Sequence, residues 1–160
     1  TFSPQRYEIW TMQSSWHNLP EFEPEGAGYQ QQPGAEFSAR DVAVSDALDA
    51  ITMDIAPAYG AVPGLGFYRR RVQLNENGLT LQDETDFSRT VALTLMSVEK
   101  PAVEGGTVQF GTLAAAHIKG FARIATEAVP ITDPRLRQAW PDTLYRTRIC
   151  FTGALTVEVQ

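Results

Sequence analysis

The chain of 160 residues has the length of one domain, and 43% of its residues are hydrophobic, enough to form a core. Its formal net charge of −6 argues against nucleic acid as the main partner, because a phosphate backbone is bound by basic surfaces. No stretch approaches the about 18 apolar residues that a membrane-spanning helix needs. A single cysteine, Cys150, excludes an internal disulfide and slightly favours the cytoplasm; a periplasmic or secreted full-length protein stays open.

The first third of the chain combines β-rich segments with one long loop. Residues 6–13 carry aromatic and β-branched side chains and predict a strand that runs into an irregular loop. The segment 21–34 is rich in Pro, Gly, Gln and Glu, which is typical of a long loop. Short strands are expected at residues 42–44 and 50–55.

A hairpin is predicted in the middle of the chain. The side chains of residues 67–74 alternate in a way that suits a strand with one solvated side. Asn77 and Gly78 follow, a pair typical of tight hairpin turns because both residues tolerate positive φ. The return strand is expected at residues 79–82.

The rest of the chain predicts more strands and one short helix. Strands are expected at residues 90–98, 108–110, 121–124, 144–151 and 155–159. Residues 133–140 are predicted to be helical, with Pro134 in the first turn and Pro141 ending the helix. Residues 113–119 stay ambiguous, since their alanines favour helix and their length and position favour strand. Many short strands with frequent turns indicate an all-β fold, an antiparallel β-sandwich formed as a single domain by residues 1–160.

A histidine and an amide adjoin in the segment after the first predicted strand. Ser14-Ser15-Trp16-His17-Asn18 places an imidazole and a carboxamide side by side in a loop. Both groups can donate hydrogen bonds to a carboxylate or a sugar hydroxyl. Taken alone, such a pair more often satisfies nearby backbone groups, so a structural role stays open beside a binding role.

This segment is followed by others in a characteristic order. They are residues 30–40, 54–59, 67–74, 131–136 and 140–146. Together with Ser14–Asn18 they resemble the C-terminal β-domain of heparinase II/III-like polysaccharide lyases. The resemblance implies a C-terminal fragment of a larger lyase-like protein, whose preceding α-helical toroid domain carries the tyrosine acid/base. The implied activity of the whole protein is β-elimination at a uronic-acid-containing polysaccharide, and the isolated chain is expected to be inactive.

The resemblance also suggests roles for individual residues. Uronate lyases remove the proton next to a carboxylate, so the site must neutralise the charge that develops there. The resemblance gives this catalytic role to His17, and makes Asn18 and Trp16 candidates for substrate binding. Because strand side chains alternate, Arg70 points opposite to its two arginine neighbours. Arg70 is expected either to pair with a carboxylate on the inner side or to bind substrate.

No cofactor is expected. The family includes members with zinc held by two histidines and one aspartate, so the resemblance leaves zinc open. A zinc site needs three or four convergent ligands. The only other histidine is His117, and the available carboxylates, Asp41 and Asp54, form no pair with it at characteristic spacing. We expect His117 to be a strand residue with a hydrogen-bonded ring, and Cys150 to be a buried, inert thiol.

The expected partners are an anionic polysaccharide or oligosaccharide and the helical toroid domain, with neither nucleic acid nor membrane. A homodimer is also predicted, because strands missing before the chain would leave the segment 6–13 uncovered. Two alternatives stay open. One is a non-catalytic carbohydrate-binding domain that uses Trp16 and the loop 21–34; the other is a purely structural domain that supports a catalytic partner.

Overall fold

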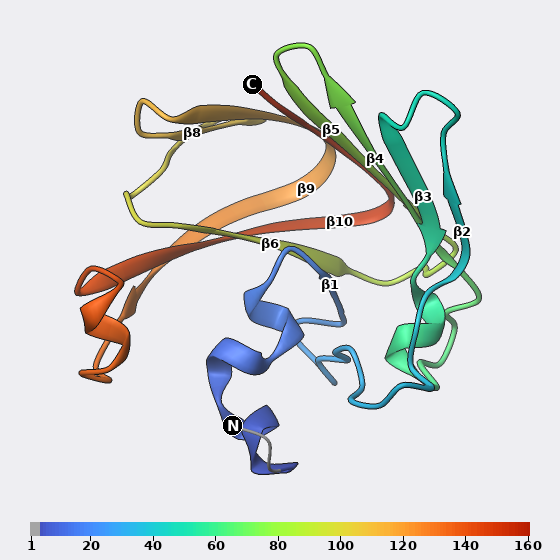
Figure 1. Ribbon diagram of the computed structural model, residues 1–160, viewed down its shortest axis with the longest axis horizontal. Helices are drawn as coiled ribbons and strands as arrows, with labels where there is room; N and C mark the ends of the chain where they lie inside the picture. The colour runs from blue at the N-terminus through green and yellow to red at the C-terminus, as the bar shows by residue number, and fades with distance from the viewer. Residues whose placement is uncertain (1–3) are drawn as a thin grey trace.

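In the computed structural model, which describes residues 4–160, ten antiparallel strands form a strongly curved sheet that folds over into two layers (Figure 1). The strands are β1 (Pro20–Phe22), β2 (Arg40–Val44), β3 (Ala50–Asp54), β4 (Tyr68–Asn75), β5 (Gly78–Thr85), β6 (Val91–Ser97), β7 (Ala102–Glu104), β8 (Thr107–Phe110), β9 (Ala114–Pro130) and β10 (Thr143–Val159). The 3-10 helices are η1 (Pro4–Glu8), η2 (Trp10–Met12), η3 (Ser14–Trp16), η4 (Ala56–Tyr59) and η5 (Leu136–Gln138). The predicted all-β antiparallel fold is confirmed.

The long hairpin β9–β10 bends and contributes to both layers. The first half of β10 pairs with β6, its second half pairs with β5, and β9 accompanies it on the other side throughout. The pairing register shifts between Cys150 and Thr156, where the ribbon turns back on itself (Figure 1). The layer with β2 to β5, β7 and β8 therefore lies over the layer with β1 and β6.

An aromatic cluster in the core anchors the short strand β1. Phe22 is fully buried and packs edge-to-face on Tyr59, Tyr68 and Phe87, with ring centroids 4.9, 5.6 and 5.1 Å apart. Aromatic pairs of this geometry contribute about 0.5–1.5 kcal/mol each beyond the burial of their surface. Phe22 thus fixes the end of the loop that carries His17.

The prediction of a strand at residues 6–13 is wrong. These residues form η1 and η2, closed by hydrogen bonds such as Met12 N to Ile9 O at 2.8 Å. The aromatic pattern instead packs Trp10 on Trp16, with ring centroids 4.8 Å apart. A segment with strand propensity forms a strand only where a neighbouring strand can pair with it. The two edges of β6 are already paired with β1 and β10. The homodimer stays a prediction, but it has lost the uncovered strand that motivated it.

The helix predicted at residues 133–140 is shorter than expected and is not α-helical. Only η5 has helical structure there, with turns on either side. Pro134 and Pro141 bracket too few residues for a stable α-helix. The ambiguous segment 113–119 lies mostly in β9.

Most predicted strands are confirmed, with different lengths. The expected strands at 42–44, 50–55, 90–98 and 108–110 correspond to β2, β3, β6 and β8. The predicted segment 121–124 belongs to β9, and the two predicted C-terminal strands are parts of β10. The loop predicted at 21–34 begins inside β1, and β7 was not predicted.

The hairpin β4–β5 is confirmed, but for a different reason. Its turn residues are Glu76 and Asn77, and neither has positive φ. Gly78 is required because a Cβ there would overlap the carbonyl oxygen of Val159, which lies against the hairpin. The close approach of a third strand therefore selects glycine, whereas the turn residues Glu76 and Asn77 need no positive φ.

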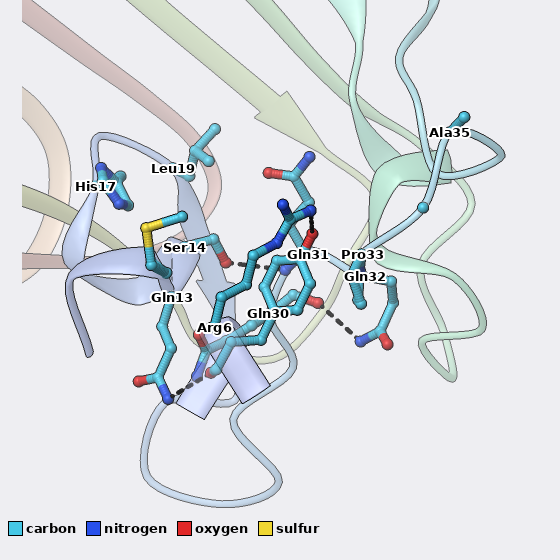
Figure 2. A pocket seen from close by; sticks show the side chains of 13 residues that line it. Arg6, Gln13, Ser14, His17, Leu19, Gln30, Gln31, Gln32, Pro33 and Ala35 are labelled. Carbon is cyan, nitrogen blue, oxygen red and sulfur yellow. Dashed lines mark hydrogen bonds between the residues drawn. The ribbon is translucent and has the colours of Figure 1, made fainter. Parts of the chain in front are cut away.

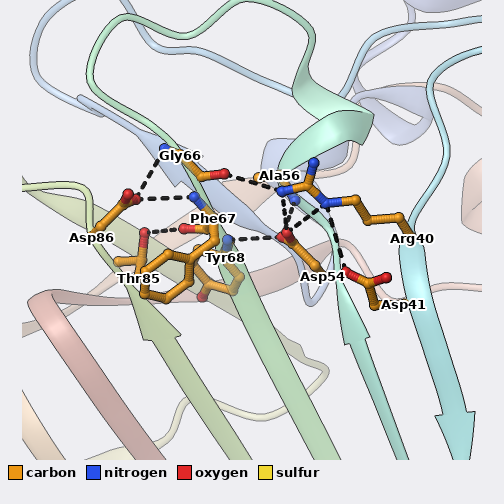
Figure 3. A network of polar contacts seen from close by, with 9 residues as sticks. All are labelled: Arg40, Asp41, Asp54, Ala56, Gly66, Phe67, Tyr68, Thr85 and Asp86. Atoms are coloured by element: carbon orange, nitrogen blue, oxygen red, sulfur yellow. Dashed lines mark hydrogen bonds and ion pairs between the residues drawn. The ribbon is translucent and has the colours of Figure 1, made fainter.

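Asp54 joins the ends of β2, β3 and β4 (Figure 3). One carboxylate oxygen accepts hydrogen bonds from the backbone N–H groups of Ala56 at 3.1 Å and Tyr68 at 2.9 Å. The other accepts from Arg40 Nε at 2.9 Å and Nη2 at 2.7 Å. Only 4% of Asp54 is exposed, so these donors replace the water that the carboxylate loses.

We expect Asp54→Asn to lower the free energy of unfolding by about 1–3 kcal/mol at neutral pH. Burial raises the pKa of Asp54, but the Tyr68 and Ala56 amides and Arg40 together bring this pKa below its ordinary value. The stabilisation is therefore complete above the unfolded pKa of about 3.9 and is lost as the pH falls through the lower folded pKa. Urea unfolding across this range should show the wild-type advantage shrinking below pH of about 4. Asp46→Asn is the control, because the side chain of Asp46 is exposed. If the free energy of unfolding of Asp54→Asn differs from that of the wild type by the same amount at every pH, the stabilising role assigned to the Asp54 carboxylate is contradicted.

In the described residues, no helix is both long and apolar enough to cross a membrane.

Candidate functional site

A polar pocket of about 720 Å³ opens between the N-terminal turns and the loop after β1 (Figure 2). Its lining residues are Arg6, Tyr7, Met12, Gln13, Ser14, His17, Leu19, Gln30, Gln31, Gln32, Pro33, Gly34 and Ala35. Although the chain has 19 acidic residues, the described lining contains no carboxylate. Its polar side chains are amides, hydroxyls, one guanidinium and one imidazole, which suit a hydroxyl-rich or anionic ligand; the apolar side chains are those of Met12, Leu19, Pro33 and Ala35.

Two segments that are distant in sequence are joined at this pocket. The backbone N–H of Gln31 donates to Ser14 Oγ at 2.9 Å, and the backbone N–H of Ser15 donates to Gln30 Oε1 at 3.3 Å. Gln13 Nε2 donates to the carbonyl oxygen of Tyr7 at 3.1 Å. These bonds hold the pocket walls together before any ligand arrives, which reduces the entropy lost on binding.

His17 lies exposed in the pocket wall. Its Nε2 is 3.0 Å from the carbonyl oxygen of Thr11, and its backbone N–H donates to Ser14 O at 3.0 Å. A carbonyl oxygen accepts only, so the contact places a proton on Nε2. Nδ1 has no such partner in the described chain, so it accepts in the neutral ring and donates in the charged ring.

Arg6 and Tyr7 add a cation and a phenol to the same wall. The Arg6 guanidinium lies over the Tyr7 ring, 4.7 Å from its centroid, and donates a hydrogen bond to the Tyr7 hydroxyl. Arg6 forms no ion pair with a carboxylate of residues 4–160. Its charge is therefore available to an anionic ligand.

His17 and Asn18 do not share a pocket, contrary to the expectation from their adjacency. The N–H of Leu19 donates to the carbonyl oxygen of His17 at 2.7 Å, which closes a three-residue turn centred on Asn18. His17 lines the polar pocket, whereas Asn18 lines a separate groove. A substrate-binding role for Asn18 stays a prediction, but not beside the imidazole.

The second groove is apolar and is lined by residues of both layers, among them residues of β5, β6 and β8. It encloses about 610 Å³. Its lining residues are Asn18, Leu79, Leu81, Leu93, Leu95, Met96, Ser97, Val98, Glu99, Phe110, Leu113, Ala114, Trp140, Leu144, Val157 and Val159. Glu99 is the one charged residue in this described lining, so the groove offers little to an acidic sugar.

Trp16 packs against protein groups. The guanidinium of Arg146 lies 3.9 Å from the Trp16 ring centroid, and Trp10 meets the same ring edge-to-face. Trp10 also approaches Trp140, with ring centroids 6.1 Å apart. Trp16 is not among the lining residues of the polar pocket. The structure therefore gives this ring a packing contact and does not bring it to His17.

Arg70 is buried and bound on several sides. Its Nε and Nη2 each donate to one oxygen of Asp83 at 2.7 Å, and its Nη1 donates to the carbonyl oxygen of Asn18 at 2.7 Å. The Tyr68 hydroxyl donates to Asp83 at 2.6 Å. Burial lowers the pKa of Arg70, but the bonded carboxylate more than offsets this and raises the pKa overall. The expected pairing with an inner carboxylate is confirmed, and Arg70 contacts the His17 loop through its backbone.

The two remaining candidates have structural partners. His117 lies in β9, with Nδ1 3.2 Å from Thr107 Oγ1, as expected of a strand residue with a bonded ring. Cys150 is buried in β10, and Arg123 Nη2 lies 3.8 Å from its sulfur. Asp41 and Asp54 both face Arg40. Within residues 4–160, no group of three or more His, Cys, Asp or Glu side chains is arranged to hold a metal ion.

Sequence reasoning missed most of the pocket. The sequence predicts a strand for Arg6, Tyr7 and Gln13, and it places Gln30 to Gln32 in a long loop and in a family-like segment without giving them a role. The available signal for a polar site was the run of three glutamines, because it places three amide side chains next to one another in a loop.

No protein-family model matches the chain, and no curated protein matches it either. The likeness to heparinase II/III-like lyases therefore rests on the sequence segments alone.

Proposed function

We propose that the His17 pocket binds a uronate-bearing oligosaccharide. We further propose that the chain is the C-terminal β-domain of a lyase-like protein in which this pocket forms one wall of the active-site cleft. The observation that carries the proposal is electrostatic. In a chain with a net charge of −6, the described pocket lining contains Arg6 and His17 and no acidic side chain. The charge of Arg6 attracts a carboxylate, which the net negative charge of the chain as a whole disfavours.

The pocket suits the chemistry of β-elimination. A base removes the proton at C5, the electron pair forms the C4–C5 double bond, and the C4–oxygen bond breaks as the leaving oxygen takes a proton. Negative charge develops on the uronate carboxylate, where Arg6 and the His17 imidazole would stabilise it. The amides of Gln13 and Gln30 to Gln32 suit the sugar hydroxyls. The proton acceptor is expected on the helical domain that the resemblance implies.

We expect His17→Ala to weaken binding of a uronate tetrasaccharide about tenfold or more, as for a lost hydrogen bond to a charged group. The free energy of unfolding should change by no more than about 0.5 kcal/mol, because the side chain is exposed. Isothermal titration calorimetry and thermal melts measure the two effects. His117→Ala is the matched control, since this histidine lies in β9 outside the pocket. Unchanged affinity in His17→Ala would sink the proposal.

A non-catalytic carbohydrate-binding domain is the second candidate, favoured by the number of amides in the pocket. The two functions differ in their dependence on charge. Binding of a uronate should weaken as salt rises, because exposed charges are screened beyond about 8–10 Å. A carboxyl-reduced, neutral tetrasaccharide that binds as well as the uronate form would favour the non-catalytic domain.

A further inference from the structure

Two buried side chains hold the backbone that follows His17, and a third, Thr94, donates to the Ser15 carbonyl oxygen before it at 2.9 Å. Arg70 Nη1, from β4, donates to the carbonyl oxygen of Asn18 at 2.7 Å. The Tyr59 hydroxyl, from η4, donates to the carbonyl oxygen of Pro20 at 2.6 Å. The backbone is thus bound at Asn18, in the loop, and at Pro20, the first residue of β1, by donors from β4 and η4.

Both donors are themselves held in place. Arg70 is 7% exposed, and its other N–H groups form the two-point contact with Asp83. Tyr59 is 3% exposed, and its ring packs edge-to-face on Phe22. Neither residue lines the polar pocket. These donors can therefore affect a ligand only through the loop backbone.

We propose that Arg70 and Tyr59 are positioning residues that fix the orientation of the His17 imidazole, an inference that rests on the proposed function of the pocket. The tight turn around Asn18 transmits the constraint, because Leu19 N–H bonds to the His17 carbonyl at 2.7 Å. A shift of the Asn18 carbonyl moves His17 with it. The ring itself is exposed and has only the Thr11 carbonyl as a further partner in the described chain.

Precise placement of such a group has a large effect. A misplacement of about 1 Å can reduce the rate of a reaction about 100-fold. Without these two donors, the turn between His17 and Pro20 would be held by the Leu19 N–H bond alone and would sample several positions, so that ligand binding would have to select one of them. The two buried donors restrict the backbone to one of these positions before the ligand binds.

The experiment compares two variants with a matched control. Tyr59→Phe removes only the hydroxyl. Arg70→Lys keeps a positive charge beside Asp83 but has one nitrogen, which cannot reproduce the fork to Asp83 and the bond to Asn18 together. Thr85→Val is the control, because it also removes a buried hydroxyl that donates to a backbone carbonyl, that of Phe67 at 2.8 Å; this hydroxyl accepts from the Phe87 amide at 3.1 Å and makes no bond to the segment 17–20.

The readouts are hydrogen exchange at the His17 and Leu19 amides, and affinity for the uronate tetrasaccharide. Tyr59→Phe and Arg70→Lys should each lose about tenfold in amide protection at these two positions, as a locally opened segment does. Affinity should fall about tenfold as well, through lost preorganisation. The control should keep wild-type values for both.

The inference would be overturned if the His17 and Leu19 amides exchanged at the wild-type rate in both Tyr59→Phe and Arg70→Lys. An equal loss of protection in Thr85→Val would overturn it as well. The exchange measurement needs no ligand. If wild-type protein does not bind the tetrasaccharide, the proposed function fails, and exchange alone still decides whether Arg70 and Tyr59 hold the loop.

Discussion

Replacing Arg70 with methionine is expected to lower the free energy of unfolding by about 3–5 kcal/mol, since it leaves a buried carboxylate without its cation. Asp83 is 2% exposed, so water cannot replace the lost donors. The Tyr68 hydroxyl would remain as a partner, but it supplies no charge. Urea unfolding followed by far-ultraviolet circular dichroism measures the loss.

The matched control for this variant is Arg40→Met, which also removes the cation from a buried aspartate. The Arg40 side chain is 55% exposed, and Asp54 keeps its two backbone donors. The expected loss is therefore only about 1 kcal/mol. A double variant, Arg70→Met with Asp83→Leu, should recover much of the stability because no buried charge remains. Equal losses in the two arginine variants would show that Asp83 is more solvated than its burial indicates.

Gly120→Ala is expected to have the second large effect, because this glycine lies where β9 passes from one layer to the other. Its φ is +85°, and a Cβ there would overlap the carbonyl oxygen of Ala154 in β10. The left-handed backbone costs a non-glycine residue about 1–2 kcal/mol. The overlap adds about 1–3 kcal/mol, as for other overpacked sites.

Gly153 provides the control on the partner strand. Its φ is +72°, but a Cβ there would meet no other atom within 4 Å in the described structure. Gly153→Ala should therefore lose only the backbone contribution of about 1–2 kcal/mol. The difference between the denaturant midpoints of the two variants measures the cost of the overlap at Gly120, where β9 and β10 approach closely. Identical midpoints would mean that the ribbon can separate at its bend without cost.

The strands were predicted best where one side of a strand is solvated. In β4, buried Tyr68 and Arg70 alternate with exposed Arg69, so the period of two is visible in the sequence. The same alternation predicts that Arg70 points opposite to its two arginine neighbours, and leaves a carboxylate and a substrate as its two possible partners. It could not reveal β9 and β10 as single long strands, because alternation is interrupted at Gly120 and at the irregular pairing around Gly153.

The N-terminal segment and the pocket depend on contacts between distant residues. The aromatic residues before His17 fit a strand by composition, but they pack against one another and against Arg146. The pocket forms only because Ser14 and Ser15 bind Gln30 and Gln31. No local pattern encodes such a meeting. The family resemblance makes His17 a candidate; it also includes Gln30 to Gln32 but gives them no role, and it does not include Arg6.

Imidazole resonances offer the most direct measurement of the central claim that an acidic sugar binds beside His17. The chain has two histidines, so His117, bonded to Thr107 in β9, is an internal control in the same spectrum. Titration with a uronate tetrasaccharide should shift the His17 resonances in a saturable manner and leave those of His117 in place. A saturating titration that moves neither histidine, or that moves only His117, would contradict the account.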